Sequence, residues 1–133
     1  MNKRTRDEYG GRKDLQDAGW RVQQQDAIAF NEGSESTQHL IAKTLVANEL
    51  RDRGYRIDTE VEKEGVGEID VVAYGKGEPP FAVEVETNPT EDVVSDKLHR
   101  YYEGEPYCEC YVLDVDELPD SITAAQEWVE AQL

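Results

Sequence analysis

Two short acidic stretches determine how the rest of the sequence is interpreted: Gly67-Glu68-Ile69-Asp70-Val71-Val72-Ala73 and Ala82-Val83-Glu84-Val85-Glu86. Successive side chains of a β-strand point to opposite faces, so the two carboxylates of each stretch share one face of their strand. The segment between them, residues 75–80, contains two glycines and two prolines and predicts a hairpin-like connection. Such a hairpin would place the two acidic pairs side by side.

The chemistry of clustered carboxylates favours a metal ion. Several carboxylates on one patch repel one another strongly unless a cation lies between them. Hard oxygen ligands suit Mg²⁺ or Mn²⁺, and such an ion polarises a phosphodiester and lowers the pKa of a bound water. A second interpretation stays open: in a chain this rich in glutamate, Val83-Glu84-Val85-Glu86 is also typical of a half-exposed strand with one solvated face.

Residues 34 to 115 resemble the core of the PD-(D/E)XK nuclease superfamily, which includes restriction endonucleases and archaeal Holliday-junction resolvases. The likeness rests on Gly-Glu-Ile-Asp, on Val-Glu-Val-Glu after the glycine-rich turn, and on a preceding helix-Gly54-Tyr55-strand segment. The resemblance implies that Asp70 and Glu84 bind the metal, with the Val85 carbonyl as a further ligand. An upstream helix of the family often supplies another glutamate, for which Glu35 matches best and Glu49 is the second choice.

The chain departs from the family pattern at one position. Glu86 stands where the family has the lysine of its Glu-x-Lys motif. Some members of the family carry a compensating lysine on the next helix, and Lys97 lies in that helix in this sequence. Lys97 would then restore the positive charge at the site; the alternative is that its ammonium group extends to solvent. Without that charge, the site would bind metal and hydrolyse its substrate poorly or not at all.

Sequence periodicity predicts an α/β fold with the element order α-β-β-β-α-β-α, in which helices flank a mixed central sheet. Ser34 and Gly54 bound the first helix, whose apolar face includes Ala42 and Leu45. Asn88 and Pro89 begin the second helix, which ends near residue 103. The predicted strands are 55–62, 66–74, 81–87 and 106–115, and the last helix is 120–133, with Ile122, Ala125, Trp128 and Val129 toward the core.

The beginning of the chain is expected to lie outside this core. Residues 1–13 predict a flexible basic arm, and residues 14–133 a single nuclease-like domain. A short helical piece at 14–19 would lead into a strand start at 20–22. The basic cluster of the arm would track a phosphate backbone or form a solvated, disordered tail; it consists of Lys3, Arg4, Arg6, Arg12 and Lys13.

The composition is strongly acidic, with a net charge of −16, a pI near 4.4 and six lysines against thirty acidic residues. Such acidity ordinarily argues against a nucleic-acid partner. Carboxylates spread along the whole chain are also typical of cytoplasmic proteins from halophiles, in which molar salt screens the charge. No apolar stretch has the length of a membrane span, and the polar residues that follow Met1 lead us to expect no secretory signal. Cys108 and Cys110 are too close to close a useful loop, which favours a reducing cytoplasm.

Two further sets of residues have alternative interpretations. His39 lies one turn after Glu35 and would either approach the acidic patch or be a structural residue. Tyr101 and Tyr102 would stack on bases or, as we expect, pack their helix against the sheet.

The expected function is metal-dependent hydrolysis of DNA phosphodiesters with Mg²⁺ or Mn²⁺, and the resemblance also allows a homodimer. Two alternatives remain: a non-catalytic subunit of the same fold that binds nucleic acid or assembles a complex, and an acidic halophilic interaction protein. Metal dependence distinguishes the first function from both alternatives.

Overall fold

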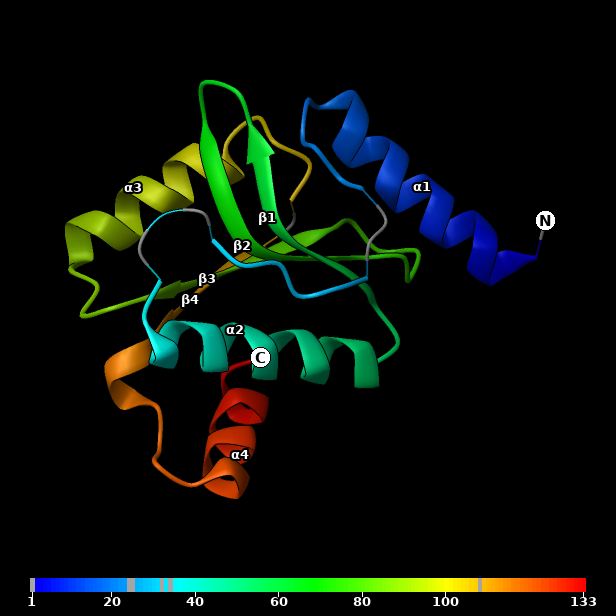
Figure 1. The fold of residues 1–133 in the computed structure, drawn as a ribbon. Coiled ribbons are helices and arrows are strands. Elements are labelled where there is room, and N and C mark those ends of the chain that lie inside the picture. The colour runs from blue at the N-terminus through cyan, green and yellow to red at the C-terminus, as the bar shows by residue number, and fades with distance from the viewer. Residues whose placement is uncertain (1, 24–25, 32, 34, 108) are drawn as a thin grey trace.

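A four-stranded sheet forms the centre of the computed structural model, which describes residues 2–23, 26–31, 33, 35–107 and 109–133. Strands β1 (Arg56–Lys63), β2 (Gly67–Tyr74) and β3 (Phe81–Glu86) are antiparallel neighbours, and β4 (Glu109–Asp114) pairs with β3 in parallel (Figure 1). A parallel pair requires a crossover connection, which α3 (Glu91–Tyr102) supplies. The predicted α/β class with a mixed sheet between helices is confirmed.

Helices cover both faces of the sheet. α1 (Lys3–Asp17) and α3 lie over one face, while α2 (Thr37–Asp52) and α4 (Ile122–Gln132) lie over the other (Figure 1). A short 3-10 helix, η1 (Val115–Glu117), follows β4. The core on the α1/α3 side includes Leu15, Trp20, Val72, Tyr74 and Tyr101. The core on the α2/α4 side includes Val46, Leu50, Val71, Val83 and Val129. Within the described part of the chain, no helix is both long and apolar enough to cross a membrane.

The N-terminal residues form a helix, whereas the sequence predicts a loose arm over residues 1–13. α1 runs without a break through residue 13, and the Asn2 side chain caps its first turn. Gly11 lies close to the sheet: a methyl group added there would be 3.1 Å from Tyr74 Cβ. Opposite charges four residues apart, such as Lys13 and Asp17, support the helix. These pairs are the signal that the arm prediction overlooked. The segment 20–22 that follows is not a strand, although its Arg21 amide donates to the Glu62 carbonyl.

Two helices begin later than the sequence predicts. α2 is capped by Ser36, whose hydroxyl accepts a hydrogen bond from the His39 amide; the predicted cap, Ser34, lies outside the described residues. α3 is capped by Thr90 instead of Asn88, which adopts a left-handed backbone conformation with φ of 49°. In both cases a hydroxyl reaches the amide three residues on, which is the usual geometry of a serine or threonine cap. Glu35 therefore precedes α2.

The buried surfaces of the two helices on the second face also differ from the predicted ones. The most buried residues of α2 are Ala42, Lys43, Val46, Ala47 and Leu50. The predicted face is rotated because α2 contacts α4 as well as the sheet. In α4, Ala125 and Val129 are buried as predicted, but Ile122 is 75% exposed. β4 begins at residue 109, later than the predicted 106.

Candidate functional site

The candidate site lies where β2 and β3 stop pairing. The two strands are paired as far as Val71 and Val83, and one further residue would place Asp70 opposite Glu84. At that point the Val85 amide donates a hydrogen bond to Asp70 Oδ2 at 2.8 Å. The Asp70 side chain thus accepts the hydrogen bond that a backbone carbonyl of β2 would accept if the two strands stayed paired. The two acidic strands are neighbours, as the sequence predicts, and Asp70 and Glu84 come together where their pairing ends, whereas Glu68 accepts from Asn31 on the β1 side.

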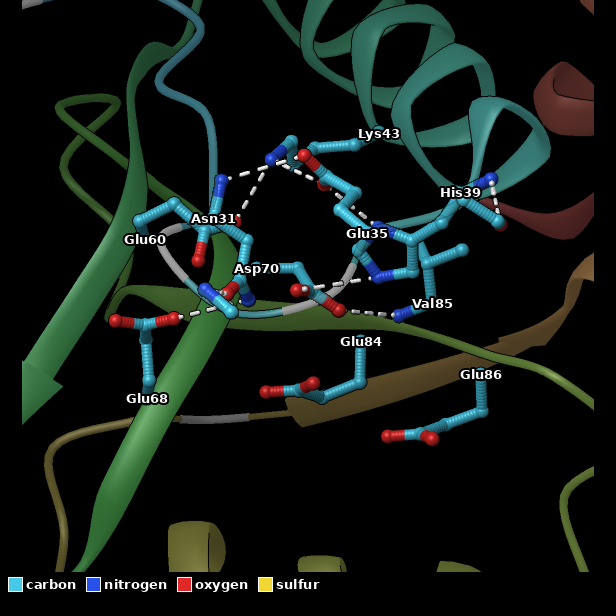
Figure 2. Close-up of polar contacts among 12 residues, drawn as sticks. Asn31, Glu35, His39, Lys43, Glu60, Glu68, Asp70, Glu84, Val85 and Glu86 are labelled. Atoms are coloured by element: carbon cyan, nitrogen blue, oxygen red, sulfur yellow. Dashed lines mark hydrogen bonds and ion pairs between the residues drawn. The ribbon is translucent and has the colours of Figure 1, made fainter.

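Asp70 is held from the α2 side of the sheet. His39 Nε2 lies 3.4 Å from Asp70 Oδ1, and Figure 2 shows the imidazole pointing from α2 toward the carboxylate. Burial acts to raise the pKa of Asp70, but the hydrogen bonds from His39 and the Val85 amide outweigh burial and lower it. In turn, hydrogen bonding to Asp70 raises the pKa of His39 to about 9. At neutral pH this pair is a carboxylate and an imidazolium.

Glu84 is the most deeply buried acid of the site. It is 2% exposed, and its Oε1 atom accepts no hydrogen bond from any described donor. Burial, followed by the charge of Asp70, raises the pKa of Glu84 well above its ordinary value. Burial and the charge of Asp70 thus disfavour ionisation of Glu84, whereas the donors around Asp70 favour its ionised form.

Lys97 reaches Glu84 from α3, on the other face of the sheet. Its Nζ lies 3.1 Å from Glu84 Oε2 and 2.6 Å from Glu86 Oε1. Burial acts to lower the pKa of Lys97, but the two carboxylates outweigh it and raise the pKa. The structure thus places Lys97 beside Glu84, although its ammonium group also binds Glu86.

Glu35 lies near this site without joining the two candidate ligands. Its Oε1 accepts hydrogen bonds from Lys43 Nζ at 2.6 Å and from His39 Nδ1 at 2.7 Å, and its Oε2 accepts one from the Asn31 amide. The second choice, Glu49, pairs with Arg53 one turn further along α2, so it does not belong to the site. Of the two upstream glutamates, Glu35 is the one that the fold connects to Asp70.

Lys43 is the residue that sequence reasoning missed. It is fully buried and binds Glu35, Glu60 and the Ala29 carbonyl. A signal for it exists, because residues 35, 39 and 43 are spaced by four and such residues lie in one row along a helix. That spacing does not reveal that Lys43 lies between two carboxylates, because the second one, Glu60, belongs to β1.

A polar pocket of about 420 Å³ adjoins the site on the β1 side, lined in part by Arg21, Phe30, Asn31, Glu60 and Glu68. Asn31 Nδ2 donates to Glu68 Oε1, which connects this pocket to the loop that holds Glu35. Hydrogen bonding to Glu60, followed by burial, raises the pKa of Glu68 to about 8. The pocket therefore carries less negative charge at neutral pH than its composition suggests.

The donor set fits a hard divalent cation. Glu84 Oε1 is a buried carboxylate oxygen without a hydrogen-bond donor, and Asp70 lies beside it as an ionised carboxylate. Among the described residues, no three His, Cys, Asp or Glu side chains are grouped as a complete metal-ligand set. Protein sites for Mg²⁺ commonly supply one or two carboxylates, with waters and substrate phosphates as the remaining ligands.

The remaining predicted residues lie away from the site or in the core. Tyr101 is buried and packs edge-on against Trp20, which confirms the structural alternative for this residue; the Tyr102 side chain and Cys108 lie outside what the structure describes. Lys3 pairs with Asp7, one turn further along α1. Arg4 and Lys13 make equivalent pairs, so α1 presents cations neutralised by neighbouring acids instead of a purely basic surface.

Comparison of the chain with protein-family models, curated proteins and solved structures finds no match.

Proposed function

We propose that this protein is a metal-dependent phosphodiesterase acting on DNA, in which Asp70 and Glu84 hold Mg²⁺ or Mn²⁺. The observation that carries the proposal is the meeting of these two carboxylates where β2 and β3 separate, with one Glu84 oxygen buried and without a donor. The resemblance of residues 34–115 to PD-(D/E)XK nucleases supplies the expected restriction-endonuclease-like topology and the substrate class. The Val85 carbonyl remains the proposed further ligand.

Each side chain has a distinct part in this function. A bound divalent ion would polarise the phosphodiester and lower the pKa of a water. Asp70 is kept ionised by His39 and the Val85 amide, so it presents a full negative charge. Lys97 keeps a cation beside Glu84, where positive charge stabilises an anionic transition state. Glu86 holds Lys97 in place.

The contact between Lys97 and Glu86 also favours a second function. Lys97 lies closer to Glu86, at 2.6 Å, than to Glu84, at 3.1 Å. A cation neutralised by Glu86 would contribute little to phosphodiester hydrolysis. In that case the protein is a non-catalytic member of the same fold, which binds nucleic acid or assembles a complex.

The test is a nuclease assay in molar KCl with Mn²⁺ or Mg²⁺, on linear duplex, single-stranded and branched DNA. We expect Asp70→Asn and Glu84→Gln to lower the cleavage rate by about 10²-fold or more, a loss typical of removing one group that stabilises the transition state. Lys97→Met should cause a loss of similar size if this lysine acts at the site. The isosteric changes keep side-chain volume, so lost cleavage is attributable to lost charge.

Asp58→Asn is the matched control, because Asp58 is another buried carboxylate of the same sheet and accepts from the Gln23 amide and Tyr74. This variant should cleave at the wild-type rate. If the folded wild-type protein cleaves no substrate with either metal, the enzymatic function is rejected. Salt-tolerant DNA binding without cleavage would then favour the non-catalytic subunit, and absence of binding would favour an acidic interaction protein.

A further inference from the structure

A buried lysine lies behind the candidate metal ligand. Lys43 is 0% exposed, and its three ammonium hydrogens have three acceptors. These are Ala29 O at 2.8 Å, Glu35 Oε1 at 2.6 Å and Glu60 Oε1 at 2.8 Å. Burying an ammonium group costs several kcal/mol even when it is paired, whereas an apolar side chain of similar volume would fill the same space. The presence of a charge at this position therefore needs a reason beyond packing.

A chain of polar contacts leads from this lysine to Asp70. The Glu35 oxygen that binds Lys43 also binds His39 Nδ1 at 2.7 Å, and the other ring nitrogen of His39 lies 3.4 Å from Asp70 Oδ1 (Figure 2). Both nitrogens of the imidazole are thus engaged by carboxylates. The ring cannot rotate without losing one of them, so the position of Glu35 determines where Asp70 is held.

Lys43 also fixes the strand that faces Asp70. In β1, Glu60 lies between the paired residues Thr59 and Val61, across from Asp70, and has a left-handed backbone with φ of 53°. A non-glycine residue in this conformation costs roughly 1–2 kcal/mol and is kept only where its surroundings require it. The ion pair with Lys43 supplies that requirement.

We propose that Glu35, bound by the buried Lys43, is a positioning residue for the metal site and acts on Asp70 through His39. This inference rests on the proposed function, since it assigns Asp70 as a ligand. Groups that orient metal ligands through hydrogen bonds commonly change metal affinity by about 10–100-fold when they are removed. Glu35, in this role, acts through His39 and does not touch the metal.

The test measures Mn²⁺ binding to the full chain by isothermal titration calorimetry, with MnCl₂ as the only ligand. Lys43→Met would leave two carboxylates buried without their cation and is expected to unfold the protein. The series of contacts is therefore interrupted at its other members, with the variants Glu35→Gln and His39→Leu. We expect both variants to bind Mn²⁺ about tenfold or more weakly than wild type. His39→Gln retains a donor toward Asp70 and should recover part of the affinity.

Glu105→Gln is the matched control. Glu105 is also a part-buried carboxylate bound to a lysine, Lys63, and it accepts a hydrogen bond from Trp20 Nε1. The Glu105→Gln change should reduce stability without weakening Mn²⁺ binding, because the described partners of Glu105 are Lys63 and Trp20 and do not include Glu35, His39 or Asp70. If wild type binds Mn²⁺ and Glu35→Gln and His39→Leu bind it equally well, the positioning role is overturned and the proposed function stands. If wild type does not bind Mn²⁺, both are overturned.

A measurement without metal tests whether His39 couples Glu35 to Asp70. Glu35→Gln and Asp70→Asn, alone and combined, are compared by their urea unfolding midpoints. We expect the two shifts to be non-additive in the wild-type background and additive in a His39→Leu background, because His39 is the group that couples them. Additive shifts in both backgrounds would overturn the inference.

Discussion

The carboxylate of Glu35 shows how a charge in the interior of this protein is neutralised by its neighbours. It is bound to a buried lysine and to an imidazolium, and it also accepts from a backbone amide. Removing one partner of a buried ion pair is far more damaging than the pair is stabilising, because the remaining charge stays buried. The loss expected for Glu35→Gln at neutral pH is therefore about 3 kcal/mol in the free energy of unfolding.

That loss should depend on pH. Burial acts to raise the pKa of Glu35, but hydrogen bonds from Lys43, the Asn31 amide and His39 outweigh it, and the pKa lies below its ordinary value of 4.5. A carboxylate of this kind stabilises the folded state above its ordinary pKa, and the contribution disappears as the pH falls through the folded-state value. We expect the difference between wild type and Glu35→Gln in urea unfolding to be full near pH 7 and to shrink below about pH 4.5. A difference of constant size across this range would contradict the ion-pair assignment.

At the scale of the element, the turn before β2 depends on a glycine. Gly67 has a φ of 142°, and a methyl group added there would lie 2.9 Å from the hydroxyl of Tyr101, which donates to the Glu68 carbonyl. This close approach of α3 to the start of β2 sets the position of the strand that carries Asp70. Backbone conformation and the contact with Tyr101 thus explain why a glycine stands at position 67, independently of any metal binding.

Gly67→Ala should destabilise the protein by about 3 kcal/mol, combining backbone strain with the clash against Tyr101. Gly65→Ala is the matched control in the same turn, because its φ of 81° is also left-handed but nothing lies within 4 Å of the added methyl. We expect the control to lose only about 1 kcal/mol in urea unfolding. Equal losses in the two variants would show that contact with Tyr101 contributes nothing.

For the whole molecule, charge density is the dominant property. The net charge of −16 is carried by a chain of 133 residues, and the cations of α1 are largely paired with acids of the same helix. Self-repulsion of this size opposes the compact state at low ionic strength and is screened at high ionic strength.

Thermal unfolding should therefore shift upward with salt. Between about 0.1 M and 2 M KCl we expect a gain of about 2 kcal/mol, or roughly 6–10 °C in Tm. Differential scanning calorimetry at fixed pH measures the shift. A Tm that does not change with KCl would contradict the prediction that the acidic surface is an adaptation to molar salt.

The sequence by itself determined the local features of the fold. Strand alternation located β1, β2 and β3 to within a residue or two, and the hairpin between β2 and β3 followed from its glycines and prolines. This hairpin makes the two acidic strands neighbours, whereas the combination of Asp70 with Glu84 was implied only by the resemblance to the nuclease family. All of these depend on residues that are close together in the chain.

Only the tertiary structure decided which charges are buried and what they bind. Lys43 belongs to α2, yet one of its carboxylates comes from the segment before the helix and another, Glu60, from β1. Periodicity identifies a helix face but not the element that covers it, so it could not show that a lysine is buried or that His39 reaches Asp70. The cost of burying charge is met by groups distant in sequence, and these meet only when the helix and the sheet come together.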